Sequence, residues 1–283
     1  MEAGYYVKVG NQIRCELCPN RCVIEEGKTG VCGVRKHIKG KLVTESYGKV
    51  TALQVDPIEK KPLAYFHPGV QVFSIGSYGC NLKCPYCQNH PIAHGKPAST
   101  AYSPDEVVEA VQRRELNFLA FTYNEPLVGF EFVLDTAKLA KEAGITTIMV
   151  SNGYVEGEPL ADLLPYIDAW NIDLKGFYPQ TYQRLGGQVQ PVLKTIEQVA
   201  AVAHVEITIL LVPGINDDRE ELKSLFEWLG ALDPSIPLHL NRYFPAWNYH
   251  EPPTSVDWMK AVAQDARHVC HRVNLGNIWE VKV

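Results

Sequence analysis

The sequence lacks the features that mark membrane-spanning, secreted and nucleic-acid-binding proteins. In its 283 residues, no apolar run reaches the roughly 18 residues that a membrane-spanning helix requires. Residues 1–10 mix polar and apolar side chains and do not resemble a secretory signal. The net charge of −5 at pH 7 gives no electrostatic basis for binding a polyanion. We therefore expect a cytoplasmic protein with no membrane partner and no nucleic-acid partner.

A fourth cysteine is missing from the most informative motif. Cys80, Cys84 and Cys87 follow an apolar stretch with the spacing Cys-x3-Cys-x2-Cys. A cubane iron–sulfur cluster is completed by four thiolates, so three leave one iron open, and an open coordination position marks a catalytic metal site. The alternative is a zinc site completed by His90 or His94. A disulfide is disfavoured, because cysteines of cytosolic chains serve mostly in metal or redox chemistry.

The order of apolar segments indicates the fold. Hydrophobic residues make up 46% of the chain, enough for a sizeable core, and short apolar runs alternate with amphipathic segments from residue 70 onward. Short connections between such segments indicate parallel strands joined by right-handed crossovers. We predict an α/β fold in which residues 69–283 form a partial (β/α)6 barrel and residues 1–68 form a small cysteine-rich extension. The predicted strands are 70–75, 118–122, 146–151, 169–174, 205–212 and 237–243. The predicted helices are 104–114, 130–143, 160–164, 192–202 and 219–229.

Polar residues follow the predicted strands, at the end of a barrel where catalytic side chains gather. Taken alone, residues 151–153 and 213–217 are typical of turns. Glu125 is different, because a carboxylate there is neither a good turn former nor a core residue. Asp173 and Lys175 alternate along a strand end and therefore face the same side, as a structural ion pair or as a functional one.

These loops and the cysteine motif together resemble the pyruvate formate-lyase activating enzyme branch of the radical S-adenosylmethionine (SAM) superfamily. Within that branch, the sequence is most similar to the radical SAM component of the AmmeMemoRadiSam system. The likeness covers nearly the whole chain. It includes residues 56–63, 79–89, 121–126, 151–153, 173–175, 212–217 and 238–239.

The resemblance implies a role for each of these elements. The three cysteines would hold a [4Fe–4S] cluster, and SAM would chelate the open iron through its amino and carboxylate groups. Tyr123 and Asn124 replace the two glycines of the family's Gly-Gly-Glu motif, in which Glu125 would hold the SAM amine. The other implied contacts with SAM are Tyr86 near the adenine, Ser151 and Asn152 at the carboxylate or ribose, Asp173 and Lys175 near the methionyl end, and His239 at the ribose or carboxylate.

The resemblance also implies the reaction. A reduced cluster would cleave SAM to a 5′-deoxyadenosyl radical, which abstracts hydrogen from a protein, peptide or small molecule, with Asp173 and Lys175 as candidate catalytic residues. An electron donor such as flavodoxin or ferredoxin and an anaerobic setting are expected. One alternative is an activase that installs a glycyl radical on a partner enzyme. The other is a non-catalytic iron–sulfur scaffold, against which the presence of Glu125, Asp173, Lys175 and His239 argues.

The N-terminal part of the chain contains a second group of cysteines. Cys15, Cys18, Cys22 and Cys32 suggest a closed four-thiolate site that holds together a piece too small for its own core. Zinc is favoured over a second iron–sulfur cluster, which could relay electrons to the first. Cys270 is expected to be a buried hydrophobic residue. The pair at 60–61, Lys-Lys, is either solvated surface or part of a lid that contacts substrate.

Overall fold

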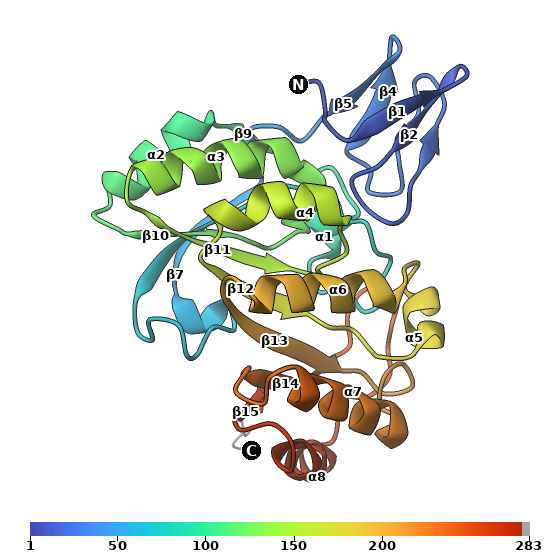
Figure 1. The fold of residues 1–283 in the computed structure, drawn as a ribbon, viewed down its shortest axis with the longest axis vertical. Coiled ribbons are helices and arrows are strands. Elements are labelled where there is room, and N and C mark those ends of the chain that lie inside the picture. Colours follow the sequence, from blue (N-terminus) through green and yellow to red (C-terminus); the bar gives the residue numbers. More distant parts are fainter. Residues whose placement is uncertain (279–283) are drawn as a thin grey trace.

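The computed structural model describes residues 1–278, and its centre is one open sheet (Figure 1). The strand order is β15-β14-β13-β12-β11-β10-β8-β7, with β7 and β15 at opposite ends. All neighbours from β8 to β15 pair in parallel, while β7 pairs with β8 antiparallel. The strands are β7 (Ala52–Pro57), β8 (Gln71–Gly76), β10 (Phe118–Phe121), β11 (Thr146–Ser151), β12 (Ala169–Asp173), β13 (His204–Leu211), β14 (Leu238–Arg242) and β15 (Val273–Gly276).

Crossover helices connect the parallel strands and lie along the outer face of the sheet (Figure 1). They are α2 (Pro104–Gln112), α3 (Phe130–Glu142), α4 (Gly157–Leu163), α6 (Val189–Ala200), α7 (Arg219–Leu232) and α8 (Val256–Arg267). Local sequence sets their starts: α2 opens with a capping box in which Ser103 and Glu106 satisfy each other's backbone N–H groups. Shorter helical turns are η1 (Ile58–Lys60), α1 (His90–Ala93), η2 (Pro126–Gly129), η3 (Leu164–Tyr166) and α5 (Pro179–Arg184).

This architecture confirms the predicted partial barrel. Each of the six predicted strands and five predicted helices is present, with ends that differ by a few residues. The sequence pattern does not reveal β7, β15 and α8. Three of the six residues of β7 are exposed, and the residues of β15 are intermediate in exposure. Because neither strand is fully buried, neither needs a continuous run of apolar residues. Their strand conformation comes from pairing with β8 and β14.

Residues 1–44 form small antiparallel sheets at one corner of the molecule (Figure 1), and a further two-stranded sheet, β6 with β9, lies apart from them. Although β7 falls within residues 1–68, its pairing with β8 makes it the first strand of the main sheet. The remaining strands are β1 (Tyr6–Val9), β2 (Gln12–Cys15) and β3 (Val23–Ile24) in one sheet, β4 (Arg35–Ile38) with β5 (Lys41–Thr44), and β6 (Lys49–Val50) with β9 (Thr100–Ala101).

A buried ion pair joins this N-terminal part to the barrel. Arg35 is 1% exposed and donates to the carboxylate of Glu131 on α3, which is 12% exposed. The same carboxylate oxygen accepts the backbone N–H of Gly4 at 2.8 Å, and Arg35 also donates to the Gly4 carbonyl at 2.9 Å. The Glu131 carboxylate therefore holds both the segment around Gly4 and strand β4, which contains Arg35, against helix α3.

Glu131→Ala is expected to lower the free energy of unfolding by about 3–5 kcal/mol, because it leaves the buried Arg35 charge without a partner. Urea denaturation followed by circular dichroism measures this loss. Glu109→Ala is the matched control, since Glu109 pairs with Arg113 at 3.0 Å on the surface of α2 with both side chains at least 60% exposed. Such a pair contributes about 0.3–0.5 kcal/mol, so equal losses in the two variants would contradict the assignment.

Candidate active site

A large cavity opens where the parallel strands end. It contains about 1330 Å³ of empty space, including its open mouth, and residues from β8, β10, β11, β12, β13 and β14 or their following loops line it. The structure brings together nearly all of the side chains predicted from sequence. Those lining the cavity are Cys80, Cys84, Tyr86, Cys87, Asn124, Glu125, Ser151, Asn152, Asp173 and Lys175.

The loop after β8 presents the three cysteines to this cavity. Gly79, at φ +95°, starts the loop, and a Cβ atom there would lie 2.6 Å from Val34 and 2.8 Å from the Cys32 carbonyl. The thiols are not paired in disulfides, and burial raises the pKa of each. Binding a metal would deprotonate them. Three unpaired thiols around one cavity fit a cluster that keeps one iron open.

Glu125 lies buried beside the cysteines and organises two neighbouring loops. Its Oε1 accepts from the Ser151 hydroxyl at 2.7 Å and from the Leu127 N–H at 3.1 Å, and its Oε2 accepts the Asn152 N–H at 2.8 Å. Burial raises the pKa of this carboxyl, against the effect of these hydrogen bonds. A carboxylate has about four acceptor sites, so three chain donors leave about one for a ligand.

Ser151, Asn152 and Asn124 mainly hold the site in shape. The Asn152 amide donates to Asn81 at 2.9 Å and lies 3.8 Å from the Cys80 sulfur. The Asn124 side chain accepts the Ser77 N–H at 2.8 Å and donates to the Gly79 carbonyl at 3.2 Å. Asn124 thus ties the Glu125 loop to the start of the cysteine loop.

Opposite these loops, Asp173 and Lys175 form the predicted pair, with 3.2 Å between Nζ and Oδ2. Burial disfavours the charge of Lys175, but the neighbouring Asp173 carboxylate opposes this effect, and the lysine pKa is raised. Tyr86 packs edge-on against Tyr243 and Tyr249, with ring centroids 6.5 and 6.3 Å away. Its ring is therefore held as one wall of the cavity.

His239 lies on β14, within the predicted strand, but it pairs with another residue of the barrel instead of lining the cavity. Its ring lies 2.6 Å from the Glu206 carboxylate, deeper in the barrel, and it does not line the cavity. Burial raises the pKa of Glu206, but hydrogen bonds with His204, His239 and two backbone N–H groups lower it to about 2. Two residues further along β14, on the same side of the strand, Asn241 does reach the cavity.

For Lys61 the sequence leaves two interpretations open, solvated surface or part of a lid that contacts substrate. Lys61 is 2% exposed and lines the cavity, so the solvated-surface interpretation is wrong for it, although Lys60 is 68% exposed. Asn171 and Thr208 of the barrel interior also line the cavity. The sequence offers one sign that Asn171 and Thr208 line a cavity, because each is a polar residue within a mostly apolar strand.

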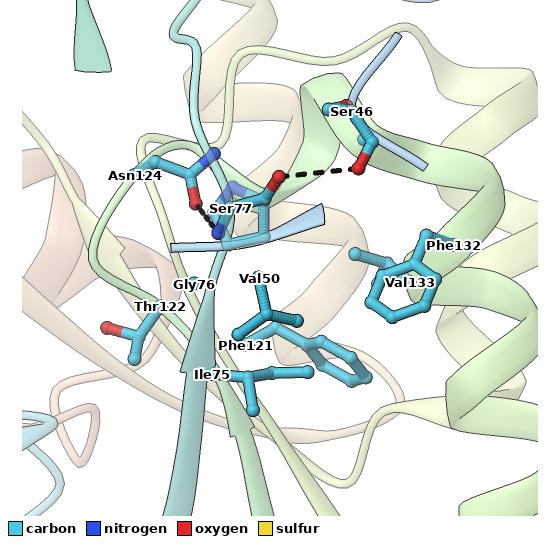
Figure 2. Close-up of a pocket in the computed structure, with 12 residues that line it drawn as sticks. Ser46, Val50, Ile75, Gly76, Ser77, Phe121, Thr122, Asn124, Phe132 and Val133 are labelled. Atoms are coloured by element: carbon cyan, nitrogen blue, oxygen red, sulfur yellow. Dashed lines mark hydrogen bonds between the residues drawn. The ribbon is translucent and has the colours of Figure 1, made fainter. Parts of the chain in front are cut away.

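A smaller hollow on the other side of β8 and β10 is distinct from this site (Figure 2). It contains about 340 Å³ of empty space and is lined mostly by apolar side chains, among them Val50, Ile75 and Phe121. Figure 2 shows Ser77 bonded to Asn124 and to the Ser46 carbonyl at its rim. No acid, base or thiol lines this hollow.

Comparison with known proteins agrees with the geometry. The sequence pattern described as the Radical SAM superfamily matches residues 74–228, more than half of the chain. The chain belongs to the radical SAM superfamily. Membership implies a [4Fe–4S] cluster, SAM as cosubstrate and a source of electrons, and the cysteines and loops described above fit the first two.

Its relatives within the radical SAM superfamily are similar over different shares of the chain. The uncharacterized protein MJ0808 of Methanocaldococcus jannaschii is 39% identical over 92% of this chain and 79% of its own. The pyruvate formate-lyase-activating enzyme of Clostridium pasteurianum is 27% identical over 56% of this chain and 68% of its own. The structure of Streptococcus suis SuiB bound to the precursor peptide SuiA has a TM-score of 0.57 at 13% identity, covering 71% of this chain and 47% of that one, which shows the fold alone.

This radical SAM protein has its second cysteine group outside the matched region. Cys15, Cys18, Cys22 and Cys32 line one hollow that contains about 320 Å³ of empty space, including its opening. Burial raises the pKa of the Cys18, Cys22 and Cys32 thiols. In residues 1–278, no three His, Cys, Asp or Glu side chains converge on the position of a single ion. The Cys32 carbonyl faces Gly79, so the two cysteine groups are neighbours.

None of the helices in residues 1–278 combines the length and apolar character needed to cross a membrane.

Proposed function

We propose that this radical SAM enzyme binds SAM in the cavity at the strand ends and abstracts hydrogen from a protein, peptide or small-molecule substrate. The observation that carries the proposal is the convergence of three free thiols, Glu125 and the Asp173–Lys175 pair on one cavity. When bound, the cluster and SAM supply a 5′-deoxyadenosyl radical for that step. The chain's own residues bind the cluster and SAM, orient the substrate and enclose the reacting groups.

In this proposal each side chain has a defined task. Cys80, Cys84 and Cys87 hold the cluster. Glu125, with about one acceptor site free, receives the SAM ammonium, while Ser151 and Asn152 fix its orientation.

Further contacts complete the SAM site. Tyr86 packs against the adenine. Lys175 and Asp173 contact the polar methionyl end, and their ion pair keeps both side chains in position. The sequence predicts that His239 of β14 contacts SAM. We assign this contact to Asn241 of the same strand, because Asn241 lines the cavity and His239 does not.

We leave the substrate class broad, as a protein, a peptide or a small molecule, because the relatives do not narrow it. Relatives with names that state an activity, such as the pyruvate formate-lyase-activating enzyme of Clostridium pasteurianum, are 27–29% identical, whereas the relative at 39% is uncharacterized. A glycyl-radical activase is therefore the second candidate. A role as the radical SAM component of an AmmeMemoRadiSam system, with an external electron donor such as flavodoxin or ferredoxin, is part of the first.

Anaerobic reconstitution tests the proposal. Reduced protein supplied with SAM is expected to form 5′-deoxyadenosine, and failure to form any would favour the non-catalytic scaffold. Deuterated candidate substrates then identify the hydrogen donor by the label that they transfer to 5′-deoxyadenosine. Transfer from a glycine of a partner protein would favour the activase.

We further propose that the four N-terminal cysteines hold a second iron–sulfur cluster rather than zinc. They line one hollow, and they lie beside the loop of the first cluster, where electron transfer between the two would be short-range. Metal analysis of a Cys80→Ala/Cys84→Ala/Cys87→Ala variant decides. Iron and sulfide near four equivalents each are expected; about one equivalent of zinc, or no metal, would overturn the proposal.

A further inference from the structure

The segment that leads from β7 to β8 is fixed across the inside of the barrel. Within it, Ile58 and Leu63 are fully buried. The Asn171 side chain of β12 donates to the Pro62 carbonyl at 2.9 Å. The Glu206 carboxylate of β13 accepts the next backbone N–H groups, those of residues 64 and 65, at 3.0 and 2.8 Å. Lys61 therefore occupies a defined place within the cavity wall.

The ammonium of Lys61 has donors that the chain does not use. It donates to Asp56 Oδ2 at 2.9 Å and lies 3.5 Å from the Tyr123 hydroxyl, at the limit of a hydrogen bond. An ammonium has three N–H donors, so at least one is available to an acceptor in the cavity. A lysine that is 2% exposed is kept charged only by groups that face it.

Tyr123 has a strained backbone conformation that places its side chain beside Lys61. Its backbone has φ +74°, which is an outlier for a bulky side chain, and such strain concentrates at functional sites. Its hydroxyl donates to Asp56 at 2.8 Å, and its ring lies 4.7 Å from the Lys61 ammonium. The Asn89 side chain, from the cysteine loop, donates to its carbonyl at 2.7 Å. Gly76 leaves the necessary room, since a Cβ there would lie 2.9 Å from Tyr123.

The charges around Lys61 favour a monoanion. Asp56 pairs with both Lys60, at 3.2 Å, and Lys61, so one carboxylate faces two ammonium groups. Lys60 is 68% exposed, so water solvates its charge, and the buried pair of Asp56 and Lys61 is neutral by itself. A carboxylate brings one negative charge to this buried pair, whereas a phosphate monoester, at about −1.5 to −2, would bring more charge that has no buried partner.

We propose that Lys61, oriented by Asp56 and Tyr123, binds a carboxylate of the substrate. This proposal rests on the proposed function, because it requires a cavity that holds a substrate beside SAM. SAM itself carries a carboxylate, so the shared chemistry could come from either molecule. The experiment must therefore separate the two.

Ligand-observed ¹⁹F NMR provides the test, with a set of fluorinated carboxylic acids, each paired with its primary amide. Reconstituted enzyme is titrated anaerobically with each probe, in the absence of SAM and with saturating SAM. We expect acids to bind better than their amides, and to remain bound when SAM is present. Acids that bind no better than amides, or that SAM displaces, would overturn the assignment to substrate.

Variants locate the binding group. Lys61→Met is expected to weaken acid binding by about tenfold or more, as loss of a charged hydrogen bond predicts. Because that change leaves Asp56 unpaired, Lys61→Met/Asp56→Asn is a second test, with both charges removed. Lys194→Met, which removes an exposed charge from α6, is the matched control and should bind acids as the parent does. Parent-like acid binding by both Lys61 variants would overturn the proposal.

The two proposals fail in different ways. An enzyme that binds acids through Lys61 but forms no 5′-deoxyadenosine would contradict the proposed function. An enzyme that cleaves SAM but binds none of the acids would contradict only the role of Lys61.

Discussion

Cys84→Ala is expected to reduce 5′-deoxyadenosine formation from SAM by more than about 100-fold. Changes to groups that merely orient metal ligands already cost about 10–100-fold, and this variant removes a ligand itself. Only Cys80 and Cys87 would remain on the loop that faces the cavity. The measurement is 5′-deoxyadenosine by liquid chromatography after anaerobic reconstitution and reduction, alongside the electron paramagnetic resonance signal of the reduced cluster.

Cys270→Ala is the matched control for this prediction. Cys270 is also a free, buried cysteine, at 1% exposure, but it packs against the Phe226 carbonyl and lies outside the cavity. The control should keep the SAM cleavage and the cluster signal of the parent. If Cys84→Ala also keeps them, the three-cysteine site is not the one that cleaves SAM.

Glu125→Gln is expected to weaken SAM binding at least about tenfold and to lower the free energy of unfolding by about 1–3 kcal/mol. The NH2 group that replaces one carboxylate oxygen cannot accept a hydrogen bond, so at least one buried donor among Ser151, Leu127 and Asn152 loses its partner. The variant also loses the negative charge that we assign to the SAM ammonium. Equilibrium dialysis with labelled SAM gives the affinity, and urea denaturation gives the stability.

A second buried glutamate separates these two effects. Glu221 is 3% exposed, accepts from the Phe177 and Tyr178 N–H groups and the Thr181 hydroxyl, and does not line the cavity. Glu221→Gln should therefore lose comparable stability while it binds SAM as the parent does. If it weakens SAM binding as much as Glu125→Gln does, the effect at Glu125 reflects stability and not a contact with SAM.

Local patterns in the sequence predict most of the fold. The apolar runs of β8 to β14 and the capping residues of α2 act over a few neighbours, so they are visible without a structure. The ends of parallel strands must share one edge of a sheet, which is why residues as distant as Cys80 and Lys175 could be predicted to meet.

The sequence pattern does not reveal how deep a side chain lies within the barrel. His239 and Asn241 lie on the same side of β14, and sequence alternation cannot distinguish the one near the mouth from the one that pairs with Glu206. Burial of Lys61 depends on Asp56 and Tyr123, which is 62 residues away along the chain. A lysine in a polar stretch has the same local signal on a surface as in a cavity.

The sequence by itself determined that this chain forms an α/β partial barrel with a three-cysteine loop and polar strand ends, because those signals depend on spacing and on near neighbours. Only the tertiary structure decided which side chains face the cavity, that Glu125 keeps about one acceptor site free, and that the four N-terminal cysteines surround a hollow beside the first cysteine loop. Those properties depend on which segments pack together. Packing between segments far apart along the chain leaves no periodic trace in the sequence.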